Sequence, residues 1–288
     1  MSRHEYASFL FRKFSEFLEE DVGLGDVTTE VVVPRDARAS AIIISKASGV
    51  VAGVEEVAEF FIMNGVTVEK SLKSGSEVSP GTVIMEVTGP ARNILVCERV
   101  ALNILMRMSG IATATAEMFR RAKAVNKNVI IAGTRKGVPG FRYFEKKAIM
   151  VGGGDPHRLH LDDCILIKDN HIAVAGGVRE AIRRARAHAS FTKKIEVEVR
   201  TLEEALEAAR EGADIIMLDN MEPDEVERVI NALKKEGLRE KVLIEVSGGI
   251  TPENVTEYAR TGVDIISAGY LTHSVRPLDM SLKIIKCW

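Results

Sequence analysis

The chain has 288 residues, of which 46% are hydrophobic and 28% are charged, and its formal net charge is −2. This composition is typical of one or two globular domains and excludes an intrinsically disordered chain. The small net charge gives no overall attraction to nucleic acid, and no apolar stretch approaches the ~20 residues that a membrane-spanning helix needs. We therefore expect neither a nucleic-acid nor a membrane partner.

Residues 4–20 are predicted to form an amphipathic helix, because apolar side chains recur there at helical spacing. A glycine-punctuated loop is expected at 21–29. Segments 38–52 and 66–88 are typical of strands and turns, with a helix between them at 54–64. This first third is predicted to be an α+β unit with mostly antiparallel strands.

A long helical stretch follows at 97–126, with an interruption expected near Ser109-Gly110. After it, short apolar runs alternate with helical segments. The runs are 129–132, 164–167, 195–199, 214–218, 242–246 and 264–267, and the helices include 177–189, 201–211, 223–236 and 252–261. Alternation of this kind predicts parallel βαβ units. No G-x-G-x-x-G fingerprint accompanies the late units, which favours a barrel, incomplete because six strands are clear rather than eight.

Three cysteines, Cys97, Cys164 and Cys287, form no C-x-x-C pair. A disulfide framework or a zinc site is therefore not expected, and a reducing compartment is the default. No signal-peptide pattern follows the charged Arg3-His4-Glu5. We expect a cytoplasmic protein.

Cations gather at the ends of the predicted strands. Arg135 and Lys136 follow one strand, Lys168 follows the next, and a glycine-rich turn contributes His157 and Arg158. The carboxyl ends of parallel barrel strands meet at one mouth, where active sites are found. Polar loops are common on their own, but cations that recur directly after strands indicate a site for an anionic ligand.

Two carboxylates, Glu198 and Asp219, lie within or directly after neighbouring strands. They have the oxygen ligands that Mg²⁺ prefers, or they are ion-pair partners of the nearby cations. The sequence pattern leaves both interpretations open.

Glycines follow the last two strands, in Ser247-Gly248-Gly249 and at Gly269. They allow backbone N–H groups to approach a phosphate, although a simple tight turn has the same pattern. Thr251 and Pro252 are predicted to begin the next helix as N-cap and first residue. Together the three sets predict a polyanion site with a phosphate at one end.

These residues lie in motifs that resemble the quinolinate phosphoribosyltransferase family. Gly133-Thr-Arg-Lys136 and Lys168-Asp-Asn-His171 are two of them, and the others are at 20–29, 98–103, 109–113, 139–142, 152–158, 196–198, 217–220, 245–250 and 271–274. The resemblance covers nearly the whole chain, in order. It implies an N-terminal α/β sandwich domain at 1–108, to which 276–288 return, and an open α/β barrel at 109–275.

The resemblance also implies an activity and an assembly. Quinolinate and phosphoribosyl pyrophosphate would give nicotinate mononucleotide, pyrophosphate and CO₂ in NAD biosynthesis, with Mg²⁺ as cofactor. The protein would be a homodimer or a higher homo-oligomer, in which Arg99 of one subunit completes the site of its partner.

By position, residues of this chain match four parts of the family's site. The quinolinate pocket corresponds to Arg99, Arg135, His157, Arg158 and Lys168, and the cations that neutralise pyrophosphate correspond to Lys136 and Lys168. The ribose and metal carboxylates correspond to Glu198 and Asp219. The 5′-phosphate site corresponds to Ser247, Gly248, Gly249, Gly269 and His273. The catalytic set implied is Lys136, Lys168, Glu198 and Asp219.

One departure from the family pattern follows the Arg-Lys pair, where Gly137-Val138 replaces the usual Thr. Two rival activities remain at this point. Nicotinate phosphoribosyltransferase uses a monocarboxylate, whereas Arg99 and the His157-Arg158 pair favour a dicarboxylate. A non-catalytic phosphosugar-binding or molybdate-associated relative would not need the intact Lys168, Glu198 and Asp219.

Overall fold

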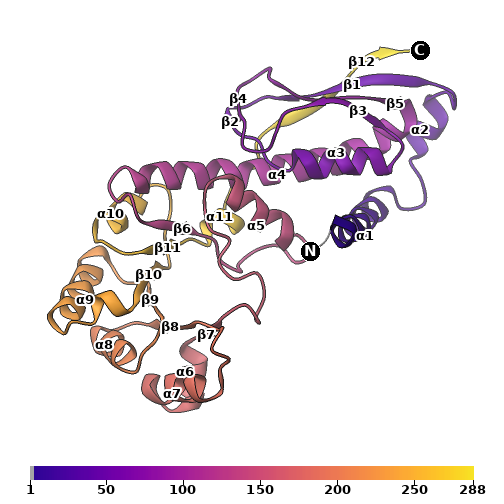
Figure 1. The fold of residues 1–288 in the computed structure, drawn as a ribbon. Helices are drawn as coiled ribbons and strands as arrows, with labels where there is room; N and C mark the ends of the chain where they lie inside the picture. The colour runs from indigo at the N-terminus through magenta and orange to yellow at the C-terminus, as the bar shows by residue number, and fades with distance from the viewer. Residues whose placement is uncertain (1–2) are drawn as a thin grey trace. The chain divides into compact units, whose positions relative to one another are not determined.

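The structure is a computed structural model that describes residues 3–288, with side chains from residue 5 onward. Residues 1–2, which the predicted N-terminal domain includes, lie outside the described residues. The chain divides into two compact units, one formed by residues up to 113 together with 276–288, the other by 114–275 (Figure 1). We call them the N-terminal unit and the barrel unit.

The N-terminal unit is an α+β unit, as its sequence predicts. Its elements are α1 (Arg3–Val22), α2 (Val27–Val32), β1 (Arg38–Ser45), β2 (Gly49–Val50), α3 (Val54–Met63), β3 (Thr67–Ser71), β4 (Glu77–Val78), β5 (Val83–Pro90), the first part of α4 (Ala91–Lys123), and β12 (Met280–Cys287). The loop expected at 21–29 is partly wrong. Asp26 accepts the backbone N–H of Thr29 at 3.0 Å and so caps the short helix α2.

The main sheet of this unit has the strand order β12-β1-β5-β3, with antiparallel pairing throughout. β1 alternates between buried and more exposed positions, so Ala39, Ala41 and Ile43 face the core. Helices α3 and α4 lie along one face of the sheet (Figure 1), and α3 buries Phe60 and Phe61. Residues 280–287 therefore form an edge strand of a sheet whose other strands come from the first third of the chain.

The interruption expected near Ser109-Gly110 is wrong, because α4 runs unbroken through both residues. A Cβ atom on Gly110 would lie 2.3 Å from the carbonyl oxygen of Arg276, so only glycine permits this approach of two backbones. Ser109 accepts the backbone N–H of Ala52 at 3.0 Å. Ser109 and Gly110 therefore lie at a point of close packing within the N-terminal unit, and not at the end of a helix.

The barrel unit contains all six strands that the sequence predicts. Its elements are β6 (Ile130–Ala132), α5 (Arg142–Val151), β7 (Ile165–Ile167), α6 (Asp169–Ala175), α7 (Val178–His188), β8 (Ile195–Val199), α8 (Leu202–Arg210), β9 (Ile215–Asp219), α9 (Pro223–Lys235), a 3₁₀ turn (Arg239–Lys241), β10 (Leu243–Ser247), α10 (Val255–Arg260), β11 (Ile265–Ser267) and α11 (Tyr270–His273). The strands are parallel in the order β6-β11-β10-β9-β8-β7. In the described chain β6 and β7 are the two edges, so the barrel is open.

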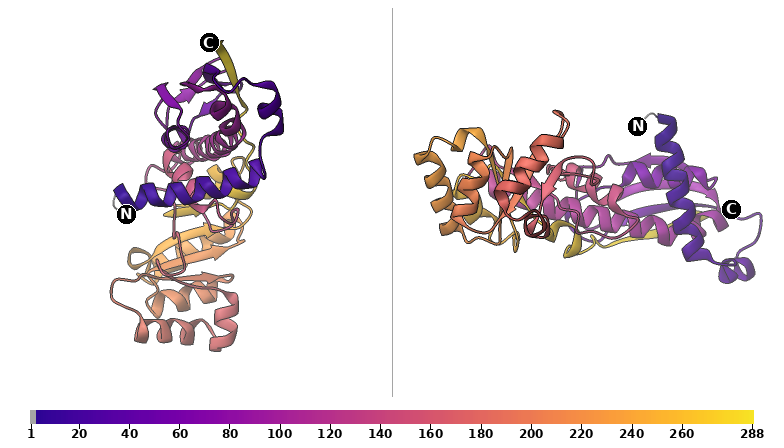
Figure 2. Two further views of the ribbon diagram at one scale, coloured as in Figure 1. Left: turned by 90° about the vertical axis from the view of Figure 1, so that its right-hand side faces the viewer. Right: turned by 90° about the horizontal axis from the view of Figure 1, so that it is seen from below.

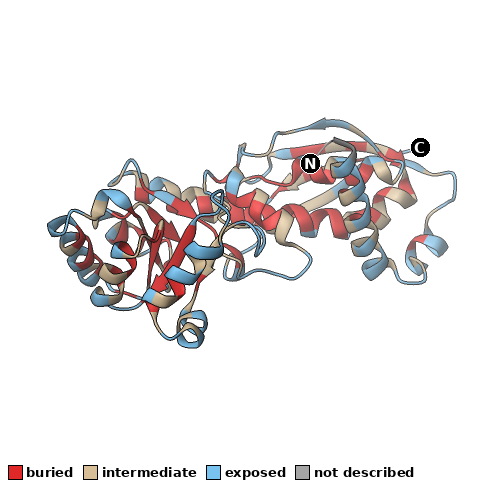
Figure 3. Cartoon of the chain, turned by 60° about the horizontal axis from the view of Figure 1, so that its bottom comes forward, coloured by how far each residue is buried: buried red, intermediate tan, exposed pale blue. Residues whose placement is uncertain are grey.

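Helices α7, α8 and α9 lie along the outer side of this sheet (Figure 2). Their outward faces are exposed, whereas the strands behind them are buried (Figure 3). Because side chains alternate along a strand, one set faces these helices and the other faces the barrel interior. Ala132, Ile215, Leu243 and Ile265 pack together as an apolar cluster.

The helix start predicted at Thr251-Pro252 is wrong. The α10 helix begins at Val255, and residues 252–254 form a turn in which Asn254 accepts the backbone N–H of Thr251 at 2.9 Å. In the part of the chain that is described, no helix has both the length and the apolar character needed to cross a membrane.

Candidate active site

A cavity of about 470 Å³ opens at the carboxyl ends of the barrel strands. Its lining comes from every strand end and from the turn between β6 and β7. The lining residues are Gly133, Thr134, Arg135, Lys136, His157, Arg158, Leu166, Lys168, Glu198, Arg200, Met217, Asp219, Asn220, Glu245, Ser247 and Ser267. The position agrees with the mouth at which α/β barrels carry their active sites.

Most of the residues that the sequence singles out come together here. Arg135, Lys136, His157, Arg158, Lys168, Glu198, Asp219 and Ser247 line the cavity. Gly248, Gly249 and Gly269 belong to the adjoining loops, His273 is the last residue of α11, and none of the four is among the lining residues. Arg99 is an exposed residue of α4 in the N-terminal unit, and it is also not among them.

Two guanidinium groups make the cavity strongly positive. Partial burial, together with the positive charges of Arg158 and Arg142, lowers the pKa of Arg135. The Nε atom of Arg135 is buried without a hydrogen-bond partner. Among the described side chains neither Arg135 nor Arg158 has a carboxylate within ion-pair distance. Partly buried positive charge of this kind is stabilised by an anionic ligand.

The two predicted metal carboxylates both have cationic partners. Lys168 Nζ lies 2.6 Å from Glu198 Oε2, and Arg200 Nε lies 3.2 Å from Asp219 Oδ2. The ion-pair interpretation is therefore realised in this structure. Both carboxylates also line the cavity, and two carboxylates with ligand phosphates are a common donor set for Mg²⁺. The residues present thus fit a magnesium ion without requiring one.

The glycines after β10 and β11 occupy positions that a side chain would disturb. Gly248 has φ +97°, and a Cβ atom there would lie 2.2 Å from Oδ1 of Asn220. A Cβ atom on Gly269 would lie 2.8 Å from Nε2 of His273 and 3.2 Å from Cδ of Lys136. Gly269, His273 and Lys136 are therefore close neighbours, although two of them are outside the cavity lining.

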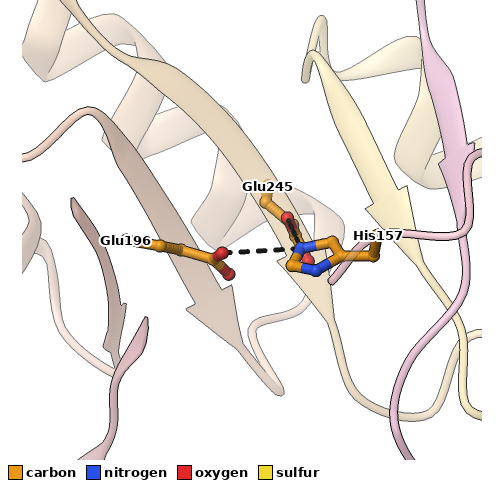
Figure 4. A group of neighbouring side chains, drawn as sticks. All are labelled: His157, Glu196 and Glu245. Carbon is orange, nitrogen blue, oxygen red and sulfur yellow. Dashed lines mark hydrogen bonds and ion pairs between the residues drawn. The ribbon is translucent and has the colours of Figure 1, made fainter. Parts of the chain in front are cut away.

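His157 does not point freely into the cavity. Its Nε2 lies 3.2 Å from Glu245 Oε2 and 3.5 Å from Glu196 Oε2 (Figure 4). Burial lowers the pKa of His157, but the hydrogen bond to Glu245 and the charges of Glu245 and Glu196 outweigh it and raise the pKa overall. Burial, reinforced by the charge of Glu245, raises the pKa of Glu196 to about 7.

Several lining residues escaped the sequence prediction. Arg200 and Asn220 directly follow β8 and β9, so the strand-end pattern already contained them. Glu245 lies inside a buried strand in the same way as Glu198 and could have been found by that signal. Ser267 is a small residue that also occurs in ordinary strands, so no sequence signal distinguishes it.

The Gly137-Val138 departure has a local cause. A Cβ atom on Gly137 would lie 1.9 Å from Oε2 of Glu145, a buried residue of α5. The other oxygen of Glu145 accepts the backbone N–H of Val138 at 3.2 Å. Glu145 thus fills the space that a side chain at 137 would need, next to Lys136.

An open parallel barrel with a polycationic cavity at its strand ends defines an enzyme of the α/β-barrel class that binds an anionic substrate. Two family models cover the chain: the N-terminal domain of quinolinate phosphoribosyl transferase matches residues 26–109 and the C-terminal domain matches 111–283. The chain belongs to the quinolinate phosphoribosyltransferase family.

Individual relatives agree with this assignment. A protein of Methanothermobacter thermautotrophicus named "Probable nicotinate-nucleotide pyrophosphorylase (carboxylating)" is 48% identical over 93% of this chain and 96% of its own. The human nicotinate-nucleotide pyrophosphorylase (carboxylating) is 42% identical over 83% of this chain and 80% of its own. The crystal structure of NadC from Streptococcus pyogenes superposes with a TM-score of 0.89, at 36% identity and with 99% of each chain covered.

Proposed function

We propose that the chain joins quinolinate to the phosphoribosyl group of phosphoribosyl pyrophosphate, with release of pyrophosphate and CO₂, and so makes nicotinate mononucleotide for NAD biosynthesis. The observation that carries the proposal is a cavity in which Arg135 and Arg158, without carboxylate partners among the described side chains, lie with the Lys168–Glu198 ion pair. Such a cavity suits a substrate pair that carries carboxylates and phosphates.

The dicarboxylate end of the site is assigned to Arg135 and Arg158. A planar guanidinium can donate hydrogen bonds to both oxygens of a carboxylate. Two guanidinium groups therefore suit a pyridine that bears two carboxylates. The partly buried position of Arg135 strengthens this interaction, because the charge there is incompletely solvated.

The pyrophosphate end is assigned to Lys136 and Lys168. Displacement at ribose C1 builds positive charge on the sugar and negative charge on the leaving group. The two ammonium groups stabilise the leaving group, while Glu198 and Asp219 stabilise the sugar, as charges already in place before the reaction. Glu198 and Asp219 would also hold a magnesium ion, which supplies further positive charge at the pyrophosphate when bound.

The 5′-phosphate is assigned to the loops after β10 and β11. Gly248 and Gly249 have positive φ angles that expose backbone N–H groups, and Ser247 adds a hydroxyl at the edge of the cavity. His273 lies beside Gly269 and contributes a ring nitrogen to the same region.

The test is an assay for release of CO₂ and pyrophosphate that requires quinolinate. Carboxyl-labelled quinolinate should release labelled CO₂ only when phosphoribosyl pyrophosphate is present. Nicotinate serves as the competing substrate, since human nicotinic acid phosphoribosyltransferase shares the fold at a TM-score of 0.61 and 16% identity. Turnover of nicotinate without quinolinate turnover would contradict the proposal.

We also propose a homo-oligomer, at least a dimer, in which Arg99 completes the site of a partner subunit. Arg99 is exposed and, among the described side chains, has no ion-pair partner. Mixing an Arg99→Ala variant with an Asp219→Asn variant should restore activity, because each supplies what the other lacks. Two inactive variants that stay inactive after subunit exchange would argue against a shared site.

A cytoplasmic location is proposed on the basis of the cysteines. Cys97, Cys164 and Cys287 are all free thiols in the structure, as expected in a reducing compartment.

A further inference from the structure

Two buried glutamates lie among the strands of the barrel, and one of them, Glu245, also lines the cavity. Glu196 on β8 and Glu245 on β10 are both fully buried, and each has one carboxylate oxygen without a hydrogen-bond partner. The imidazole of His157 enters between them from the turn that precedes β7 (Figure 4). A buried charge without a partner is costly, so the contacts of this ring decide what the cluster does.

The hydrogen bonds of the ring identify its tautomer. The Nδ1 atom of His157 accepts the backbone N–H of Arg158 at 2.8 Å, so Nδ1 carries a lone pair. A neutral imidazole then has its proton on Nε2, which faces Glu245 Oε2 at 3.2 Å and donates to it. In this neutral tautomer both nitrogens are engaged by groups of the protein, although the ring itself lines the cavity.

The same three side chains have the donor set of a metal centre, because their ligand atoms lie within 4.8 Å of one another. A metal ion would need the lone pair of Nε2. In the neutral ring the only lone pair is on Nδ1, where the N–H of Arg158 occupies it. The hydrogen-bond pattern therefore favours a proton over a metal between His157 and the glutamates.

The backbone at His157 is held in an unfavourable conformation. Its φ angle is +54°, a left-handed value that few residues other than glycine adopt. Three contacts hold the turn: Asp155 Oδ1 accepts the His157 N–H at 2.6 Å, Lys146 donates to the carbonyl of Pro156, and the ring donates to Glu245. Strain of this kind persists only where the surroundings over-determine it, and it occurs often at functional sites.

We propose that Glu245 is a positioning residue for the pyridine dicarboxylate, acting through His157 on Arg158. By accepting the Nε2 proton, Glu245 leaves Nδ1 free to accept the N–H of Arg158, and this bond fixes the backbone from which the Arg158 side chain enters the cavity. The inference rests on the proposed function for the identity of the ligand. It assigns to His157 the support of the cation, in addition to its place in the cavity lining.

Two substitutions at position 245 test the proposal. Glu245→Gln keeps an oxygen that accepts the Nε2 proton, whereas Glu245→Ala removes it. Calorimetry should show quinolinate binding ~10- to 100-fold weaker in the alanine variant, the range expected for a lost buried hydrogen bond, and nearly unchanged in the glutamine variant. Binding of phosphoribosyl pyrophosphate should stay within about threefold of the native value in both variants, because its assigned groups, Lys136 and Lys168, are not supported by this hydrogen bond.

Equal losses for the two ligands, or a loss in Glu245→Gln as large as in Glu245→Ala, would overturn the assignment. Thermal melting of both variants accompanies these measurements. If Glu245→Ala does not fold, weakened quinolinate binding in the glutamine variant would still contradict the proposal, and the tautomer of His157 in the native protein tests the hydrogen bond itself.

A second measurement needs no substrate. With ¹⁵N-labelled histidine at alkaline pH, the signal that disappears in His157→Asn should show a protonated Nε2 and an unprotonated Nδ1. In Glu245→Ala it should shift toward a mixture of tautomers. A protonated Nδ1 in the native protein, or loss of the Nε2 proton on addition of Zn²⁺, would refute the inference. If the native protein fails to bind quinolinate, the proposed function fails while the tautomer result still stands.

Discussion

The two sheets of this protein differ in how far their charged side chains are buried. In the antiparallel sheet of the N-terminal unit, Glu86 on β5 is partly exposed and lies 3.8 Å from the exposed Lys70 on β3. In the parallel sheet of the barrel unit, Glu196 and Glu198 on β8 and Glu245 on β10 are all buried. An antiparallel sheet can keep one face in water, whereas helices and the barrel interior cover both faces of a parallel strand.

Because of this difference, a glutamate indicates a functional site when it lies in the parallel sheet but not when it lies in the antiparallel sheet. A glutamate in a strand that alternates between buried and exposed positions needs no further explanation. A glutamate in a strand that is buried throughout must have a partner, and at the open end of a barrel that partner belongs to the site.

The largest effect is expected at the carboxyl edge of the parallel sheet. Asp219→Asn removes a charge assigned to the sugar and the metal, and turnover should fall by about 10²–10³, with a changed dependence on Mg²⁺. Asp36→Asn, an exposed change in the N-terminal unit, should have no effect. Steady-state rates across a magnesium titration provide the measurement, and an unchanged titration would remove Asp219 from that role.

Loss of a cavity guanidinium should separate the two substrates. Arg135→Ala should weaken quinolinate binding by roughly 10- to 100-fold, the range for hydrogen bonds to a charged group, and affect phosphoribosyl pyrophosphate much less. Arg228→Ala, an exposed arginine on α9, is the matched control. Calorimetry with each ligand measures the difference. Similar losses for both ligands would show that Arg135 does not belong to the dicarboxylate end.

A substitution in the N-terminal unit should instead change stability alone. Gly110→Ala forces a methyl group against the carbonyl of Arg276, and we expect a loss of about 1–3 kcal/mol in the free energy of unfolding, with the KM values unchanged. Gly137→Ala is the counterpart in the barrel unit and should also alter KM, because Lys136 precedes it. Asn103→Ala, exposed on α4, is the control. Denaturant unfolding that shows no loss for Gly110→Ala would contradict the close backbone approach.

A fourth effect concerns the dependence of stability on pH. Burial, together with the charge of Arg142, lowers the pKa of Lys146 from 10.5 to about 8. Between these values the unfolded chain binds more protons than the folded one, so stability should rise with pH across this window, by at most about 1.4 kcal/mol per pH unit. Lys146→Met should abolish the rise, which unfolding measured at several pH values would detect. A slope that persists in this variant would mean that another group causes it.

Much of the fold follows from local patterns. All six barrel strands were predicted because buried apolar runs and intervening helices differ clearly in period. The break expected at Ser109-Gly110 was wrong because the need for glycine comes from Arg276, far away in the sequence. The predicted start of α10 at Thr251 was wrong because the side chain of Asn254 accepts the backbone N–H of Thr251 and stabilises a turn before the helix.

For the site, residue types and positions were predictable, but their partners were not. Lys168, Glu198 and Asp219 were recognised at the strand ends, yet nothing local to Asp219 indicates that Arg200 pairs with it. The orientation of His157 depends on Glu196 and Glu245, which join it only after three separate segments have folded. The roles of Arg99 and Mg²⁺ stay predictions.

The pairing of β12 with β1 has a consequence for biosynthesis. Ile42, Ile43 and Ile44 of β1 bond to partners between Ser281 and Lys283, so this edge stays open until more than two hundred further residues have been translated. An exposed apolar strand edge is a template for pairing with other chains. The nascent chain should therefore depend on chaperones, or on rapid completion, most strongly at the N-terminal unit.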